Sequence, residues 1–202
     1  MSSKTTQSKN PKPGLLISPS RFFYARSNLL AALLATAVFA GYLVFVLMGK
    51  GAAFEVANST VRSLGTTLGF GQTEILAFLA ERSEEMILAY INFNQVWDSL
   101  FALIYGVMYV IWVSVLFKPY SKRATILNLL PFGQVVFDWL ENFALATLSN
   151  EYLAGGTISS TTAALASTFS TTKWVFSLLV YGVIFVGIVM RVVRAIKKRS
   201  QR

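Results

Sequence analysis

The sequence predicts an all-α polytopic membrane protein, a bundle of four transmembrane helices with one amphipathic helix on the outer side. The 202-residue chain is 54% hydrophobic and only 13% charged, which is a composition typical of membrane proteins. Its apolar residues stand in four long runs, and roughly 20 such residues form a helix that crosses about 30 Å of hydrocarbon. Its basic residues gather on one side of these runs, as they do in the cytoplasmic loops of membrane proteins.

The predicted spans and the tails around them divide the chain. The spans cover residues 28–48, 97–117, 124–148 and 174–190. Together they define a transmembrane domain of residues 28–194, with a basic tail at 1–27 before it and a second basic tail at 195–202 after it. The first tail is polar, contains prolines and has no acidic residue, so we expect it to be flexible.

The charges predict how the chain crosses the membrane. Of the 18 basic residues, all but Lys50, Arg62, Arg82 and Lys173 lie before the first span, between the second and third, or after the fourth. This distribution places both termini on the cytoplasmic side, or on the matrix or stromal side of an organelle. It does not distinguish a bacterial inner membrane from a mitochondrial or plastid inner membrane.

The same distribution predicts the partners of the basic residues. The net charge of +9 does not indicate nucleic-acid binding, because these residues are the expected anchors of a polytopic protein at an anionic leaflet. We expect anionic lipid headgroups to contact the basic residues that follow the fourth span: Arg191, Arg194, Lys197, Lys198 and Arg199.

Two longer segments are predicted on the outer side. In the first, residues 72–94 indicate an amphipathic helix with Thr73 as a candidate N-cap, because apolar residues recur at helical spacing and acidic residues gather on the opposite face. The second, residues 149–173, is rich in Ser, Thr, Ala and Gly. It is typical of an outer loop with one short helix.

The side chains that many catalytic and metal sites use are missing from the sequence. The chain has no Cys and no His, which removes thiolate nucleophiles, the commonest general base and the usual zinc ligands. No phosphate-binding loop, dinucleotide fingerprint or metal-spacing motif is present. We therefore predict a non-enzymatic protein without a metal or cofactor.

The second and third predicted spans carry polar stripes that face each other. At 1.5 Å per residue, Tyr105 lies about 12 Å from the outer end of its span and Asp138 about 15 Å from the outer end of the next. The short connection makes the two spans an antiparallel hairpin, so we expect Tyr105 to hydrogen-bond Asp138 or Glu141. The predicted intramembrane cluster is Asp98, Tyr105, Gln134, Asp138, Glu141 and Asn142.

These acids need compensation, because one Asp at the centre of a membrane helix costs about 2.5 to 3.5 kcal/mol. No Lys or Arg lies within any predicted span, and Lys173 falls in the outer loop. Three solutions remain open. The carboxyl groups are protonated, or Arg82 folds down from the amphipathic helix to pair with Asp98 or Glu141, or water or a cation enters a cavity beside them.

A pattern of polar residues extends over about residues 80–148. It consists of Asp98 followed by Tyr105-Gly106, and then Asp138-Trp-Leu-Glu141-Asn142. In this pattern the chain resembles a family of uncharacterised four-span integral membrane proteins, in which an Asp/Tyr-Gly helix is followed by an Asp-x-x-Glu-Asn helix. The resemblance implies a four-helix bundle with the acids facing inward. It implies no activity, cofactor or partner.

Three functions fit these residues. The favoured one is an accessory or scaffold subunit of a larger membrane complex, such as an energy-transducing one, in which the carboxylate and Tyr cluster locks the bundle and other membrane subunits are partners. The alternative is a small proton- or cation-linked carrier or channel that uses Asp98, Asp138 and Glu141. The third is an intramembrane enzyme with Asp138 and Glu141 as acid and base, which requires a substrate-sized cavity that contains both.

Overall fold

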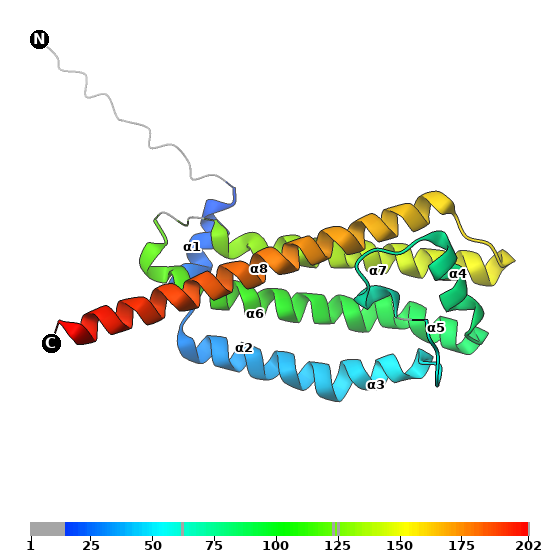
Figure 1. Cartoon of the computed structure of the whole chain (residues 1–202), viewed down its shortest axis with the longest axis horizontal. Coiled ribbons are helices and arrows are strands. Elements are labelled where there is room, and N and C mark those ends of the chain that lie inside the picture. The colour runs from blue at the N-terminus through cyan, green and yellow to red at the C-terminus, as the bar shows by residue number, and fades with distance from the viewer. Residues whose placement is uncertain (1–14, 62, 123, 125, 202) are drawn as a thin grey trace, which may run out of the picture.

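A computed structural model describes residues 15–61, 63–122, 124 and 126–201 of the chain (Figure 1). These residues form helices and no strand, as the sequence predicts. Three helical rods are long and apolar enough to cross a membrane, and they cover Leu29–Phe54, Glu84–Tyr120 and Ser160–Ser200. The fold is therefore all-α, and these three rods are compatible with an integral membrane protein.

The first rod matches the first predicted span and extends beyond it. It consists of α2 (Leu29–Tyr42), a π-helical turn (Leu43–Leu47), α3 (Met48–Gly51) and a short 3-10 turn (Ala52–Phe54). It begins at Asn28, whose side-chain oxygen accepts a hydrogen bond of 2.9 Å from the backbone N–H of Ala31. This bond satisfies one of the free N–H groups at the helix start.

The second rod begins before the second predicted span, and the predicted amphipathic segment is split into two helices. The expected helix of residues 72–94 is two helices, α4 (Gln72–Ala80) and α5 (Glu84–Asn92), because Ser83 starts a new helix by accepting from the N–H of Met86. After α5 the rod continues through a π-helical segment (Phe93–Asp98) into α6 (Ser99–Phe117) and ends in a 3-10 turn (Lys118–Tyr120). Thr73 lies inside α4, which begins after Gly71.

The third predicted span corresponds to α7 (Leu130–Gly155), which begins later and ends later than residues 124–148. Pro131 stands in its first turn, where proline is tolerated because the N–H that it lacks would have no helical partner. A 3-10 turn (Leu127–Leu129) precedes the helix. Gly156 ends it with φ 70°, a left-handed conformation that suits glycine.

The prediction of an outer loop at residues 149–173 is wrong. Helix α8 (Ser160–Ser200) starts at the N-cap Ser159 and includes most of that segment. Its Thr side chains bond carbonyls one turn back, as Thr172 Oγ1 does to the Thr168 oxygen at 2.8 Å. Its buried face, with Ala163 and Ala166, packs along α7. Tertiary packing therefore outweighs the weak helix propensity of this composition.

Both predicted tails contain helix. Residues 17–26 form α1 (Ile17–Arg26), and residues 195–200 continue α8. Helix α1 packs on α6, and Tyr24 Oη donates a hydrogen bond of 2.8 Å to the Ala124 carbonyl. Residues 1–14, to which the rest of the predicted flexible tail belongs, lie outside the described residues.

The long helices lie side by side along the longest axis of the molecule (Figure 1). Helix α6 is central, because α2, α7 and α8 all pack against it, and α7 also packs along α8. Apolar side chains of α2 and α8 point outward, and Phe45 is 85% exposed. Such surfaces are expected where lipid replaces water.

One end of the molecule, which we name the cap, has a core of its own. The cap comprises α4, α5, residues 55–61 and 63–71, and the adjoining ends of α7 and α8. Its buried residues include Ile75, Phe78, Leu79, Tyr90, Leu148 and Ala166, and Phe54 at the end of the first rod packs with them.

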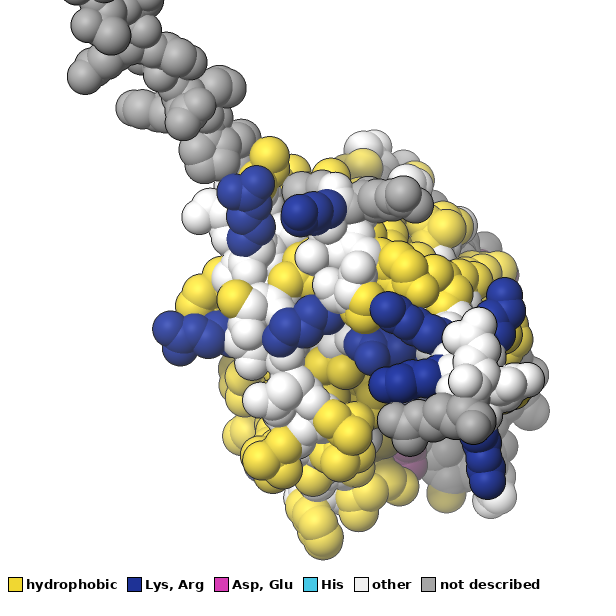
Figure 2. All heavy atoms as spheres, turned by 90° about the vertical axis from the view of Figure 1, so that its left-hand side faces the viewer, with side chains coloured by type: hydrophobic (Ala, Val, Ile, Leu, Met, Phe, Trp, Pro, Cys, Tyr) yellow, Lys and Arg dark blue, Asp and Glu magenta, His cyan; other side chains and the backbone are white. Residues whose placement is uncertain are grey.

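The opposite end, which we name the basic end, holds α1, the connection between α6 and α7, and the last turns of α8. Figure 2 shows Lys and Arg side chains gathered there, with almost no acidic side chain in view. The five residues expected to contact lipid headgroups, Arg191 to Arg199, are exposed at this end.

Candidate functional site

The hairpin of α6 and α7 brings the predicted polar stripes together. Tyr105 Oη donates a hydrogen bond of 2.6 Å to Asp138 Oδ2, which confirms the contact expected from the depths of the two residues. One turn nearer the cap, Asn142 Nδ2 donates to Asp98 Oδ2 at 2.9 Å. Gly106 allows this close approach, because a side chain there would collide with Val135 of α7.

Lys173 supplies these acids with a basic partner, which the predicted spans do not contain. Its Nζ lies 3.3 Å from Asp138 Oδ1, pairs with Glu141 Oε2, and donates to the Gly65 carbonyl at 3.1 Å. The expectation that no basic residue compensates the acids from within the helices is therefore wrong. Lys173 lies inside α8 and not in a loop.

A signal for Lys173 was present in the sequence. Ser170, Lys173 and Ser177 recur at steps of three and four, so they continue one face of the fourth predicted span toward the chain's N-terminus. All three are buried in the structure. The Ser- and Thr-rich composition concealed this periodicity.

Arg82 does not take the place proposed for it beside Asp98 or Glu141. Its Nε donates to the Phe54 carbonyl at 2.9 Å, its Nη1 donates to the Phe78 carbonyl, and its guanidinium lies over the Phe78 ring. Burial lowers the pKa of Arg82 from its ordinary value, while neighbouring Tyr90 and Glu81 raise it. Arg82 thus fastens the cap to the end of the first rod.

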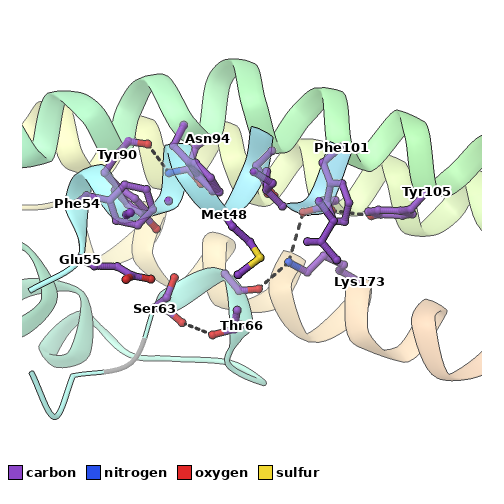
Figure 3. Close-up of a pocket in the computed structure, with 18 of the residues that line it drawn as sticks. Met48, Phe54, Glu55, Ser63, Thr66, Tyr90, Asn94, Phe101, Tyr105 and Lys173 are labelled. Carbon is purple, nitrogen blue, oxygen red and sulfur yellow. Dashed lines mark hydrogen bonds and ion pairs between the residues drawn. The ribbon is translucent and has the colours of Figure 1, made fainter. Parts of the chain in front are cut away.

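A cavity of about 870 Å³ lies beside the charged residues. Its polar wall includes Asp98, Asp138 and Lys173, and Glu55 stands at its mouth in the cap. Figure 3 shows Lys173 and Tyr105 at one end of the cavity, Glu55 and Tyr90 at the other, and Met48 between them. The volume is within the range of ordinary ligand pockets, about 300 to 1,000 Å³.

Several polar atoms in the walls of this cavity lack partners. Tyr90 Oη, Gln134 Oε1 and Trp174 Nε1 are buried and make no hydrogen bond within the described part of the chain. All three residues line the cavity. Because buried polar groups in folded proteins are nearly always paired, these walls are suited to water or a polar solute.

The charges of the site do not balance. We name the group Asp98, Tyr105, Asp138, Glu141, Asn142 and Lys173 the charged cluster. When its groups are ionised it contains three carboxylates and one ammonium, so its net charge is negative. Asp98 has no Lys or Arg nitrogen within 4 Å among the described residues, since both ion pairs there belong to Lys173. Glu141 lies behind Lys173 and does not line the cavity.

A second buried polar group, which we name the neutral cluster, lies toward the basic end. Asn128 Nδ2 donates to Ser114 Oγ at 2.9 Å and to the Ser20 carbonyl at 3.0 Å, and Ser20 Oγ donates to Asn128 Oδ1 at 2.7 Å. The cluster joins α1, α6 and the turn before α7. All three side chains are completely buried.

The described residues contain no group of three or more His, Cys, Asp or Glu side chains that could hold a metal ion. Comparisons of the chain with protein families, with curated proteins and with solved structures found no match. The resemblance to a four-span family stays a prediction.

Proposed function

We propose that the protein crosses the membrane four times, through the three long rods and through α7, and acts as a proton- or cation-linked carrier. The length of α7 supports the fourth crossing, since its 26 residues make a helix of about 39 Å. Its outer face is apolar, with Phe143 71% exposed. Its polar face meets α6 and α8, so the acids of the charged cluster are turned away from lipid.

The basic end supports an orientation for this bundle. Positive charge gathers on the cytoplasmic side of membrane proteins, or on the equivalent side of an organelle. Both described ends of the chain, α1 and the last turns of α8, belong to the basic end. We therefore place the cap and the mouth of the cavity on the outer side.

The cavity beside an excess of carboxylates is the observation that carries the proposed function. A cluster that only locks helices together needs balanced charges and a dry surround, because an uncompensated buried charge is costly. Here Asp98 and Asp138 face a large cavity, and one ammonium serves three acids. Protons or a cationic solute complete the charge balance.

The cavity is closed toward the basic end, which favours a carrier over an open channel. Of the lining residues on α6 and α8, Tyr109, Ser177 and Tyr181 lie nearest the basic end. Beyond them α6 and α8 touch at Gly187, where an added Cβ would lie 2.9 Å from Leu116 Cβ. A solute bound from the outer side crosses only if this contact opens, as alternating access requires.

This arrangement makes the other two functions less suitable. An enzyme that uses Asp138 and Glu141 as acid and base needs both on the cavity wall, and Glu141 is behind Lys173. An accessory subunit of a larger complex leaves the cavity without a role. A complex that co-purifies in mild detergent, combined with no flux, would restore the accessory role.

Flux in liposomes tests the proposed carrier. Protein in phosphatidylcholine vesicles, with a pH dye inside and valinomycin to balance charge, should dissipate a proton gradient faster than empty vesicles do. Asp138→Asn should reduce the rate to that of empty vesicles. Glu85→Gln, which changes an exposed acid of the cap, should leave it unchanged. Wild-type protein that matches empty vesicles, with and without a Na⁺ or K⁺ gradient, contradicts the proposal.

A further inference from the structure

We propose that the solute is a single-chain organic amine, which enters the cavity from the lipid layer between α2 and α8 and binds Asp98 through its ammonium group. This inference rests on the proposed function, because it names the class of cation that the carrier takes. It depends on three features of the cavity: an apolar wall, an opening on one side, and a carboxylate without a basic partner.

The two long walls of the cavity differ in chemistry. The first rod contributes Phe39, Leu43 and Leu47, which are apolar, and Met48, whose side chain is flexible. The opposite wall contributes Asp98 from the segment before α6, Asp138 of α7 and Lys173 of α8. A solute that fits both walls has a charged group at one end and an apolar chain along its length.

In the proposed membrane orientation, the side of the cavity between α2 and α8 faces lipid. Helix α2 packs on α6, whereas α8 packs on α6 and α7, and Figure 1 shows α2 and α8 on opposite sides of α6. Two lining residues at this side, Met48 of the first rod and Tyr181 of α8, are 63% and 45% exposed. An amphipathic solute dissolved in the outer leaflet would reach the acids through this opening.

Asp98 is the carboxylate best placed to receive an ammonium group. It lines the cavity, and one of its oxygens accepts from Asn142. Asp138 is less available, because Tyr105 and Lys173 already contact its two oxygens.

The negative charge of the site excludes the common phospholipids as its solute. Phospholipid headgroups carry a phosphate, which the surrounding carboxylates Asp98, Asp138 and Glu55 would repel. Lys173, the nearest basic group, is already occupied by two acids. An amine without a phosphate carries only the favoured charge.

Binding of dodecylamine tests the inference on the full chain. Protein in phosphatidylcholine nanodiscs is titrated with radiolabelled dodecylamine, and the amount bound by empty nanodiscs is subtracted. We expect saturable binding of one amine per protein. Asp98→Asn should weaken the affinity about tenfold or more, as expected for the loss of a hydrogen bond to a charged group, and Glu85→Gln should not. Leu47→Trp, which fills the apolar wall and leaves every acid in place, should also weaken binding.

Dodecanol and laurate separate the contributions of the head and the chain. Both should bind much more weakly than dodecylamine if the ammonium group determines recognition. Equal binding of dodecanol, or an Asp98→Asn variant that binds dodecylamine as tightly as the wild type, overturns the inference. No dodecylamine binding together with intact proton flux rejects the amine and leaves the carrier standing. Saturable, Asp98-dependent binding without any flux supports the amine site and rejects the carrier.

Discussion

The molecule has two buried polar clusters, and they are built in opposite ways. The neutral cluster joins Ser20, Ser114 and Asn128 by hydrogen bonds of 2.7 to 3.0 Å, with all three side chains completely buried. The charged cluster also joins three helices, α6, α7 and α8, but it carries more acids than bases and borders a cavity. The side chains of the neutral cluster are bonded to one another, whereas the charged cluster has room for an additional charged partner.

This difference indicates that the neutral cluster stabilises the fold, whereas the charged cluster serves a function. A satisfied neutral network stabilises a helix junction without charge to compensate. A buried ion pair adds little net stability over apolar packing, yet its disruption is costly. The neutral cluster is thus the better lock, and the charged cluster is better explained by what it binds.

The largest expected effect is the removal of Lys173. Lys173→Met leaves Asp138 and Glu141 without their basic partner, so we expect the free energy of unfolding to fall by about 3 to 5 kcal/mol. Unfolding in mixed micelles, followed by circular dichroism, measures it. Adding Glu141→Gln should recover part of the loss, because it removes one uncompensated acid. An unchanged stability of Lys173→Met would contradict the ion pairs.

Disruption of the neutral cluster should have the next largest effect, on stability alone. Asn128→Leu removes the buried hydrogen bonds that Asn128 makes with Ser114 Oγ, the Ser20 carbonyl and Ser20 Oγ, which should cost about 2 to 3 kcal/mol. Proton flux per folded protein should not change. Asn150→Ala, which loses only a bond to the carbonyl one turn back, is the matched control and should cost much less. If Asn128→Leu abolished flux in folded protein, the division between the clusters would fail.

A smaller effect tests the contact between Tyr105 and Asp138. In a cycle of Tyr105→Phe, Asp138→Asn and the double variant, we expect a coupling free energy of about 1.5 kcal/mol, because the hydrogen bond exists only when both residues are present. The comparison uses the same unfolding assay. Additive losses of stability would show that the two side chains do not interact.

The sequence predicts the charged cluster better than the elements around it. Spacing and depth are sufficient to pair Tyr105 with Asp138, because a short hairpin leaves little freedom between α6 and α7. They do not predict Lys173, because Ser and Thr are weak helix formers and only packing along α7 makes that segment helical. The position of Pro131 in the first turn of α7 depends on where the preceding turn ends, which the local sequence does not determine.

The neutral cluster, by contrast, could not be predicted from the sequence. Asn128 falls on the polar stripe of the third predicted span, but its partner Ser20 belongs to a tail expected to be flexible. The contact between them spans 108 residues. Periodicity within one helix carries no information about such a pairing, so α1 and its attachment became visible only in the structure.

The most direct test of the difference between the clusters uses the absence of cysteine from the chain. Ser177→Cys places a thiol on the cavity wall, and Ser114→Cys places one in the neutral cluster. Each variant, in liposomes, is treated with a cationic trimethylammonium methanethiosulfonate and with its anionic sulfonate counterpart. We expect Ser177→Cys to react, and to react faster with the cationic reagent, while Ser114→Cys reacts with neither. Equal protection of both thiols, or faster reaction of Ser177→Cys with the anionic reagent, would contradict it.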